Sequence, residues 1–387
     1  MKKTIVFLFL FVASCLTFAD FKSLNKALNL PLLNEEGCWQ REDLEQALMG
    51  RRLKLNGNSV RRSVFLRNYF VFNEPAVELV IISDKSDNVT QVDIVFQNKG
   101  DSSDIKKMNA AIKKSYKTIK DRLTAMIGPA KRTDYGPKGM TNDALEWQDG
   151  NVKFVLEFNK KEYTILHIGY GKDYSAQTDT KKLKRDNFLE NIVKKDNGDT
   201  YIDNIPMVDQ GSKGYCATAT LERVLRYYGI TQVSQHQLAD VADTGVGGGT
   251  PVDEMISGTK RLLTKYGLRI YNTGDLSLGK IKKSIDNGAP LLWWMRPNQE
   301  YNSFLRMSRM NRSKYTDLKL WLKKIKDYRI PKDGGSHMCL IVGYNEETEE
   351  IAVSNSWGDN DMQPAWVPLR LAKRVSYGHI YSVGAKR

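Results

Sequence analysis

The sequence predicts two α+β domains in series, and the second combines a helix that carries a cysteine with an antiparallel sheet that carries a histidine and an asparagine. Three observations predict this fold class. Apolar residues recur at helical spacing after Cys216, two apolar runs of strand length follow His337 and precede Asn355, and an amphipathic helix over about 104–127 stands between two groups of strand-like segments. Packing of helix against antiparallel sheet is therefore expected in both halves.

Residues 1–19 have the pattern of a secretory signal, because a basic start precedes an apolar run too short to span a bilayer. Cleavage is expected after Ala19. The alternative is that residues 12–15 act as a lipoprotein box, so that the signal ends at residue 14 and a lipid anchors Cys15 to a membrane. Both alternatives predict an extracytoplasmic protein, secreted or periplasmic in the first case and membrane-anchored in the second.

Residues 20–172 are predicted to form a separate α+β domain with an accessory or pro-domain role. Short helices are expected near 21–28 and 42–48, and the longer helix over 104–127 ends before Gly128. Strands are expected around 63–72, 77–82, 91–96, 144–147, 152–158 and 163–169. No catalytic constellation is recognisable in this domain, and His167 is interpreted as a packed residue.

Residues 173–190 are interpreted as a basic linker, because turn-forming and charged residues follow one another there without periodicity. The second domain then covers 191–387. The length of 387 residues agrees with two domains, and no second apolar run is long enough for a membrane span. Besides Cys15, the cysteines form an odd set that does not suggest a disulfide framework: Cys38, Cys216 and Cys339.

Cys216 has the surroundings of a nucleophile. It begins a predicted helix, where the helix dipole and free backbone N–H groups favour the thiolate. Gln210, six residues upstream, offers an amide to an oxyanion beside the sulfur. His337 opens one strand and Asn355 ends the next, so a hairpin places the amide beside the imidazole and fixes its tautomer, while Trp357 shields their hydrogen bond from water.

Gln210, Cys216, His337 and the run Asn355-Ser-Trp357-Gly358 follow one another in an order that resembles the papain-like cysteine peptidases. Segments 233–238, 248–251, 265–267 and 289–292 also fall in the order of that family, so the resemblance covers about 205–375. It implies that Cys216 is the nucleophile, His337 the general base and acid, Asn355 its orienting partner and Gln210 the oxyanion donor. It implies no metal or organic cofactor.

The surroundings of the cysteine depart from the usual family pattern. Tyr215 precedes Cys216, and Ala217 and Thr218 follow it, where the family has Ser or Gly and then Trp. This helix, followed by Arg-Tyr-Tyr-Gly229, is similar to bacterial peptidases of the bacteriocin-leader-processing type. The subfamily stays open.

The resemblance also implies a substrate groove. Gly248 and Gly249 match the family's glycines that hydrogen-bond the substrate backbone, and the absence of side chains permits that approach. Trp294 is expected to line the main specificity pocket opposite Met338, although a core position is the simpler interpretation of the Trp293-Trp294 pair. His236, in the first turn of a helix capped by Ser234, is expected to be solvated.

The predicted activity is therefore peptide-bond hydrolysis by an exported cysteine peptidase acting on a protein or peptide substrate. One alternative is a transamidating or acyl-transferring enzyme of the same fold, against which Asn355 argues because such enzymes commonly use Asp. The other alternative is a catalytically silent binding protein, against which the intact set of four polar residues argues.

Segment 297–336 holds ten basic and four acidic residues, a net charge of +6 out of +14 for the chain. Leu318, Trp321, Leu322, Ile325 and Tyr328 follow helical spacing within it, which predicts a helix with lysines on its outer face. The simplest interpretation is a solvated basic surface. The alternative is that it rims the cleft and attracts acidic peptides or an anionic envelope surface. Nucleic acid is not an expected partner, because no base-stacking platform is evident.

Overall fold

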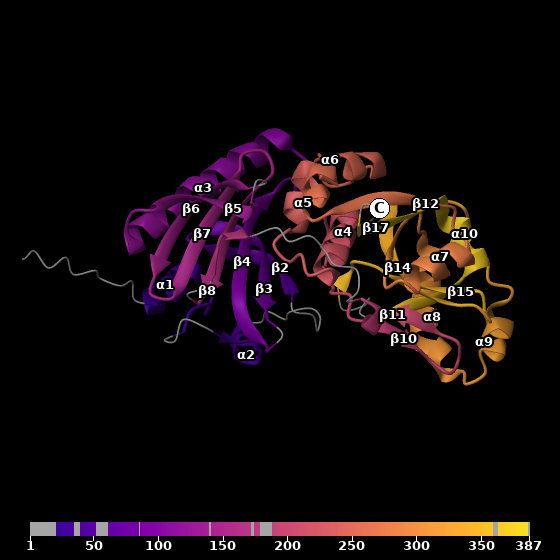
Figure 1. Cartoon of the computed structure of the whole chain (residues 1–387). Helices are drawn as coiled ribbons and strands as arrows, with labels where there is room; N and C mark the ends of the chain where they lie inside the picture. The colour runs from indigo at the N-terminus through magenta and orange to yellow at the C-terminus, as the bar shows by residue number, and fades with distance from the viewer. Residues whose placement is uncertain are drawn as a thin grey trace, which may run out of the picture.

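The computed structural model describes residues 21–34, 39–51, 61–84, 86–138, 141–171, 174–178, 188–358 and 363–385. Figure 1 shows two bodies side by side, an N-terminal one in indigo and magenta and a C-terminal one in orange and yellow, with helices α4 and α5 where they meet. The predicted signal segment, with Cys15, and Cys38 lie outside the described residues.

The N-terminal domain is a large, mostly antiparallel sheet with α3 packed on it. The sheet order is β2-β3-β4-β8-β7-β6-β5-β9, with β1 beside β4 and only the β5–β9 pair parallel among the described strands. Its elements are α1 (Phe21–Leu28), β1 (Trp39–Gln40), α2 (Arg41–Met49), β2 (Arg61–Val71), β3 (Glu74–Ser83), β4 (Asn88–Asn98), η1 (Lys99–Asp101), α3 (Ile105–Ile127), β5 (Lys131–Pro137), β6 (Asn142–Asp149), β7 (Val152–Asn159), β8 (Tyr163–Tyr170) and β9 (Gln177–Thr178).

The three helices and six strands predicted for this domain are confirmed, whereas strands β1, β5 and β9 were not predicted. Asp104 caps α3 by accepting from the backbone N–H groups of Lys106 and Lys107, and Ile112, Ile119 and Leu123 of its apolar stripe are fully buried. Part of the predicted linker also belongs to this domain, because β9 extends the sheet at β5 and Ala176 is buried.

The C-terminal domain packs helices around a second sheet, of order β10-β11-β14-β13-β17-β12 with β15 and β16 beyond β14. Its elements are η3 (Leu189–Asn191), β10 (Ile192–Lys194), β11 (Thr200–Ile202), α4 (Cys216–Tyr227), α5 (Gln235–Val241), α6 (Val252–Lys265), β12 (Leu268–Gly274), α7 (Leu278–Ile285), β13 (Leu291–Met295), α8 (Gln299–Asn311), η4 (Arg312–Lys314), α9 (Leu318–Ile325), β14 (His337–Asn345), β15 (Glu350–Ser354), β16 (Ala365–Pro368), α10 (Leu369–Val375) and β17 (Ser376–Ala385).

Helix α4 is the central helix of this domain. Leu221, Val224 and Leu225 are fully buried in the domain core. The helix ends at Tyr227, shortly before Gly229, whose φ of 81° lies in the left-handed region, and the N–H of Ile230 returns to Leu225 O at 2.9 Å. Thr220 Oγ1 donates to Met338 O at 3.1 Å, so the helix is joined to the middle strand of the sheet.

Segment 297–336 forms α8, η4 and α9. Trp321 and Ile325 bury the apolar side of α9, while Lys319, Lys323 and Lys324 are exposed, as predicted. Arg312 differs from that prediction, because it is 4% exposed and pairs at 2.8 Å with both Asp199 and Glu350. Helix α9 lies at the edge of the domain that faces away from α4 and the N-terminal domain (Figure 1).

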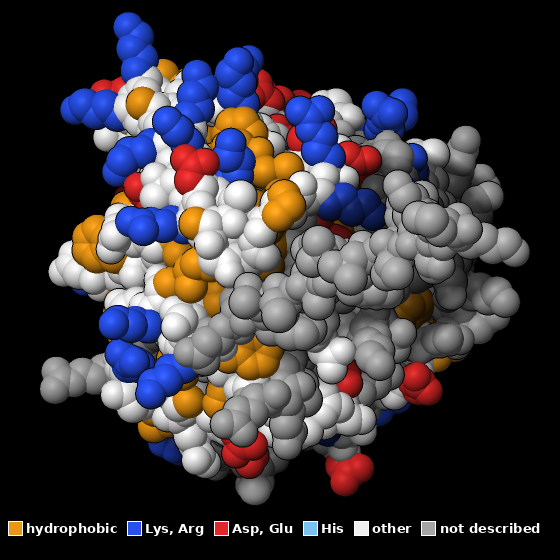
Figure 2. Space-filling model, turned by 90° about the vertical axis from the view of Figure 1, so that its left-hand side faces the viewer, with side chains coloured by type: hydrophobic (Ala, Val, Ile, Leu, Met, Phe, Trp, Pro, Cys, Tyr) orange, Lys and Arg blue, Asp and Glu red, His pale blue; other side chains and the backbone are white. Residues whose placement is uncertain are grey.

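Basic residues are also abundant on the N-terminal domain. Figure 2 shows Lys and Arg spread over the face at the left of Figure 1, with fewer Asp and Glu and with apolar side chains between them. Helix α3 contributes exposed Lys106, Lys107, Lys113, Lys114, Lys117 and Arg122. The positive charge is therefore not confined to segment 297–336.

None of the helices within the described ranges is both long and apolar enough to cross a bilayer.

Candidate active site

Cys216 is the first residue of α4 and is partly exposed. Burial raises the pKa of its thiol, and backbone hydrogen bonds from Met338, Ala217 and Cys216 itself offset only part of that increase. Burial and the helix N-terminus therefore act on this thiol in opposite directions. The contact with Met338 places the sulfur beside the start of β14, where His337 lies.

His337 is held between a polar and an aromatic neighbour. Its Nε2–H donates to Asn355 Oδ1 at 3.0 Å, and the indole of Trp357 stacks on the ring with centroids 4.8 Å apart. The imidazole is 6% exposed, and burial lowers its pKa to about 4, although the Asn355 hydrogen bond acts in the opposite direction. A neutral imidazole whose Nε2 is engaged by Asn355 leaves Nδ1 as the nitrogen that can accept a proton from a thiol.

Arg223 holds the end of β15 that carries the asparagine, and sequence reasoning missed it. Its Nη1 donates to Asn355 O at 2.7 Å, its Nη2 to Ser354 Oγ at 2.7 Å and its Nε to Pro206 O at 3.0 Å. The side chain is 2% exposed. The signal in the sequence was a charged residue two turns after Cys216, placed between the apolar residues Leu221 and Val224 of the predicted helix.

Gln210 lies in the loop before α4. Its backbone N–H donates to Ser356 O at 2.9 Å, which joins the loop to the segment between Asn355 and Trp357. Its side-chain Nε2 donates to Lys213 O at 3.3 Å, and the residue is 8% exposed. The amide has a second hydrogen, so this arrangement is compatible with donation to an oxyanion.

The two glycines of the predicted groove differ in their surroundings. Gly248 pairs with Gly214, and a Cβ added to Gly248 would lie 2.3 Å from the Gly214 backbone. Gly249 donates its N–H to Gly214 O at 2.7 Å, is exposed and has open space where a side chain would stand. Gly249 therefore offers an open side to an extended chain, while its carbonyl already accepts from Gly245 N–H at 3.1 Å, and Gly248 is required by the loop itself.

Trp294 and Met338 are cross-strand partners on β13 and β14, as predicted. Met338 is 1% exposed and belongs to the core, so of the two only Trp294 reaches the surface. There its ring stacks on that of Tyr377, with centroids 4.3 Å apart, and its Nε1–H donates to Ser336 Oγ at 2.8 Å. Trp293 is fully buried, as the core interpretation predicts for that residue.

His236 does not lie in solvent, contrary to the prediction. It is 2% exposed, and its Nε2 is 3.2 Å from Glu78 of the N-terminal domain. The capping box of Ser234 and Gln237 is present as predicted. The prediction was wrong because it treated α5 as a surface helix, whereas the N-terminal domain covers it.

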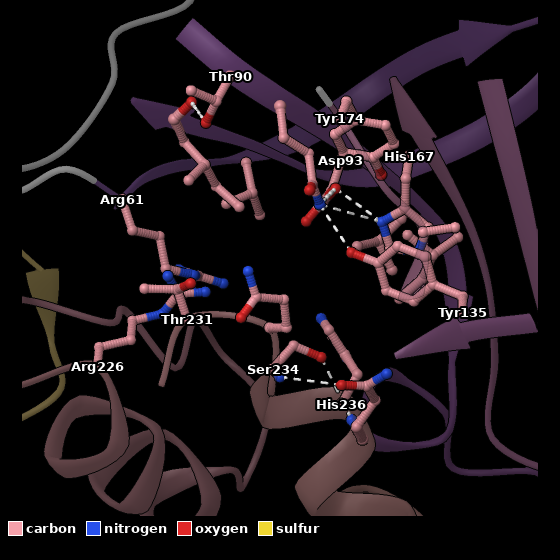
Figure 3. Close-up of a pocket in the computed structure, with 18 of the residues that line it drawn as sticks. Arg61, Thr90, Asp93, Tyr135, His167, Tyr174, Arg226, Thr231, Ser234 and His236 are labelled. Atoms are coloured by element: carbon pink, nitrogen blue, oxygen red, sulfur yellow. Dashed lines mark hydrogen bonds and ion pairs between the residues drawn. The ribbon is translucent and has the colours of Figure 1, made fainter. Parts of the chain in front are cut away.

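A cavity of about 260 Å³ lies where the two domains meet, away from Cys216. Figure 3 shows its labelled residues coming from both domains, with Arg61, Asp93, Tyr135 and His167 from the N-terminal domain and Arg226, Thr231 and His236 from the C-terminal domain. Within the described ranges, no group of three or more His, Cys, Asp or Glu has the geometry of a metal site.

Residues 202–382 match the model of the Peptidase_C39 like family. The solved structures that are similar include a protein described as a C39-like peptidase from Bacillus anthracis and xylellain, a cysteine protease from Xylella fastidiosa. The Bacillus protein is 15% identical, with a TM-score of 0.31, and the match covers 49% of this chain and 99% of that protein. Xylellain is 11% identical, with a TM-score of 0.32, and the match covers 54% of this chain and 92% of xylellain. The search of curated proteins finds no match.

Proposed function

We propose that the chain, whose residues 202–382 match the model of the Peptidase_C39 like family, is a cysteine peptidase that hydrolyses peptide bonds through Cys216, His337 and Asn355, with Gln210 as oxyanion donor. The observation that carries this proposal is the 3.0 Å hydrogen bond between His337 and Asn355 at the end of β14 that adjoins the cysteine. A peptidase acts on protein or peptide substrates, and the chain is expected to do so without a cofactor.

The reaction begins with a neutral pair, because burial disfavours both the thiolate and the imidazolium. His337 Nδ1 takes the thiol proton as Cys216 Sγ attacks the carbonyl carbon of the scissile bond. The oxyanion that forms accepts hydrogen bonds from Gln210 Nε2 and the Cys216 backbone N–H. His337 then gives its proton to the departing amine, which leaves a thioester. Water attacks the thioester while His337 takes a proton from it, and the acid is released as the thiol is restored.

The proposal is tested with the full mature chain and a thiol-directed epoxysuccinyl peptide probe. Cys216→Ala is expected to abolish both hydrolysis of a casein or peptide substrate and labelling, while circular dichroism and thermal unfolding stay unchanged. His337→Ala is expected to do nearly the same. Cys339 serves as the matched control: it is buried beside Met295, so Cys339→Ala should keep both activities. Unchanged turnover in Cys216→Ala would end the peptidase assignment to this site.

Acyl transfer is the alternative within the same fold, and the acyl-enzyme is common to both. Adding a primary amine such as glycine methyl ester to the assay separates them, since a transferase diverts the acyl group to the amine and a peptidase releases mainly the acid. We expect mainly acid, because Asn355 occupies the third position. A catalytically silent protein would give neither product nor labelling.

The exposed lysines of α9 support a weaker proposal, in which segment 297–336 attracts acidic peptides or an anionic envelope surface. Lys323→Glu/Lys324→Glu/Lys326→Glu should then reduce the salt dependence of kcat/KM for acidic peptides relative to neutral ones. If kcat/KM depends on ionic strength equally in wild type and variant, the segment is a solvated surface without a role in substrate attraction.

Export is a further proposal, supported by the composition of residues 1–19. Mass analysis of the N-terminus after cell fractionation should find a chain starting at Asp20, or a lipid-modified chain starting at Cys15. A full-length chain in the cytoplasm would contradict export.

A further inference from the structure

The loop that connects Gln210 to Cys216 is held by the other domain. Lys213, in the middle of this loop, is 3% exposed, and its Nζ is 3.0 Å from Glu78 Oε2 on β3 of the N-terminal domain. The ammonium also lies over the ring of Phe65, 5.0 Å from its centroid. A buried lysine is stabilised only where its charge is paired, and Glu78 is the nearer of its two carboxylate partners, the other being Asp101 of η1 at 3.9 Å.

Glu78 is the centre of a charge cluster that crosses the interface. It is fully buried, and His236 Nε2 at 3.2 Å and Arg61 Nη2 at 3.8 Å also face its carboxylate. Burial alone would raise the pKa of Glu78, but Lys213, His236 and Arg61 together hold it well below its ordinary value. Arg61 in turn lies 3.0 Å from Glu222 on α4, so the helix of the nucleophile is joined to the same cluster.

Close packing adds neutral contacts on both sides of Lys213. Tyr215, next to Cys216, is 1% exposed and accepts at its hydroxyl from the Gly100 N–H at 3.2 Å. A Cβ on Gly100 would lie 2.4 Å from the Tyr215 ring. Gly211, next to Gln210, has a φ of 68° and packs against Phe65, where a Cβ would lie 2.5 Å from the ring.

The glycine segment of the groove meets the same part of the N-terminal domain. The N–H of Gly247 donates to Lys99 O at 3.2 Å, next to the Gly100 that binds Tyr215. Gly249 in turn donates to Gly214 O at 2.7 Å. The loop before the nucleophile and the segment beside it therefore rest on a common support, formed by Phe65 of β2, Glu78 of β3 and η1.

We propose that Glu78 is a positioning residue of the peptidase site, which acts through Lys213 to fix the loop between Gln210 and Cys216. This inference rests on the proposed function. It makes the N-terminal domain an integral part of the active enzyme. Without the Glu78 carboxylate, the nearest remaining anion is Asp101, whose Oδ2 is 3.9 Å from Lys213 Nζ, so the ammonium shifts away from β3 and the loop moves with it. A displacement of about 1 Å at the oxyanion site costs about 10²-fold in rate.

The test compares Glu78→Gln with Glu74→Gln in the full chain. Glu74 is a matched control, because it is also a buried carboxylate on β3, but its partners Ser115, Thr118 and Lys114 belong to the N-terminal domain. We measure kcat, KM and backbone hydrogen exchange over 209–216. Lys213→Met and the double variant Glu78→Gln/Lys213→Met complete a cycle. Lys213→Met removes the buried charge instead of leaving it unpaired, so it serves if Glu78→Gln does not fold.

Glu78→Gln is expected to lower kcat about 10²-fold with KM changed less than about threefold, and to speed exchange over 209–216. Glu74→Gln should leave kcat within about twofold. The double variant should be no slower than the slower single variant, because both changes act through one contact. Unchanged kcat and unchanged exchange in Glu78→Gln, or losses that add in the double variant, would overturn the proposal. A wild-type chain without hydrolysis would instead refute the proposed function, and the exchange comparison would still decide whether Glu78 holds the loop.

Discussion

Lowering the pH is the most direct test of the buried His337. Burial lowers its pKa from an ordinary value of 6.5 to about 4, so the imidazole should stay neutral, and able to accept the thiol proton, well into the acid range. At pH 5, a group with a pKa of 4 is about 90% neutral, whereas one with a pKa of 6.5 is about 3% neutral. The two cases differ about 30-fold in the fraction of competent enzyme.

The assay is kcat/KM for a peptide without ionisable side chains between pH 3.5 and 8. We expect a plateau that extends down to about pH 4.5 and falls below it. The hydrogen bond to Asn355 raises the His337 pKa, so Asn355→Ala should move the acid limb lower while reducing the rate. An acid limb near 6.5 would show that the imidazole is not desolvated and would refute the argument from burial.

Alkylation of Cys216 by iodoacetamide separates this neutral pair from a thiolate–imidazolium pair, which would also give a low acid limb. Burial raises the pKa of the thiol, so alkylation should be slow at pH 6 and rise steeply only in the alkaline range. Fast, pH-independent alkylation between pH 5 and 8 would demonstrate the ion pair. The helix N-terminus would then outweigh burial at this cysteine.

Three other changes have defined outcomes. Gln210→Ala should lower kcat by about 10²-fold or more, the usual effect of one oxyanion donor, and an unchanged kcat would remove its catalytic role. Arg312→Met should lower the free energy of unfolding by about 3–5 kcal/mol because it leaves the Asp199 carboxylate unpaired, whereas the exposed Arg306→Met should change it by less than about 0.5 kcal/mol in urea titrations. Burial alone would lower the pKa of His167, but the carboxylates of Asp93 and Glu157 raise it to about 9. The contribution of His167 to the free energy of unfolding is therefore present below pH 6.5 and is lost as the pH rises through 9. In urea titrations this loss should be on the order of 3 kcal/mol, and it should be absent in His167→Gln.

The sequence predicts most of the peptidase domain because its signals are local. The helical spacing after Cys216, the strand that His337 opens and the strand that ends before Asn355 are all patterns within a single element. The hairpin of β14 and β15 then follows from chain proximity, and the hydrogen bond between His337 and Asn355 follows from the hairpin. The bounds of α3 were equally local, since Asp104 and Gly128 mark its ends.

What could not be predicted depends on pairing between segments far apart in the chain. Within their own segments, Lys213 and His236 are ordinary polar residues. Both are buried in the folded protein, where they contact Glu78, which lies more than a hundred positions earlier in the chain. Arg312 resembles the other basic residues of its segment until Asp199 and Glu350 are placed beside it. Whether a charged side chain can be buried depends on which partners lie beside it in the fold, and hydrophobic periodicity does not reveal those partners.

The role of the N-terminal domain gives the last prediction. The basic composition of 181–185 suggested a site of cleavage, after which a restraining pro-domain would release an active enzyme. The contacts of Lys213, Tyr215 and Gly247 with the N-terminal domain argue for the opposite outcome, because each supports a segment of the active site.

A specific protease site placed within 179–187 distinguishes the two roles. Cleavage alone should leave the fragments associated and the activity within about twofold, because buried pairs such as Arg61 with Glu222 are little screened by salt. After separation in urea and removal of the urea, the C-terminal fragment alone should have lost at least about 10²-fold in kcat, and adding the N-terminal fragment should restore it. A separated C-terminal fragment that is more active than the intact chain, and is inhibited when the N-terminal fragment returns, would establish a pro-domain and refute the supporting role of these contacts.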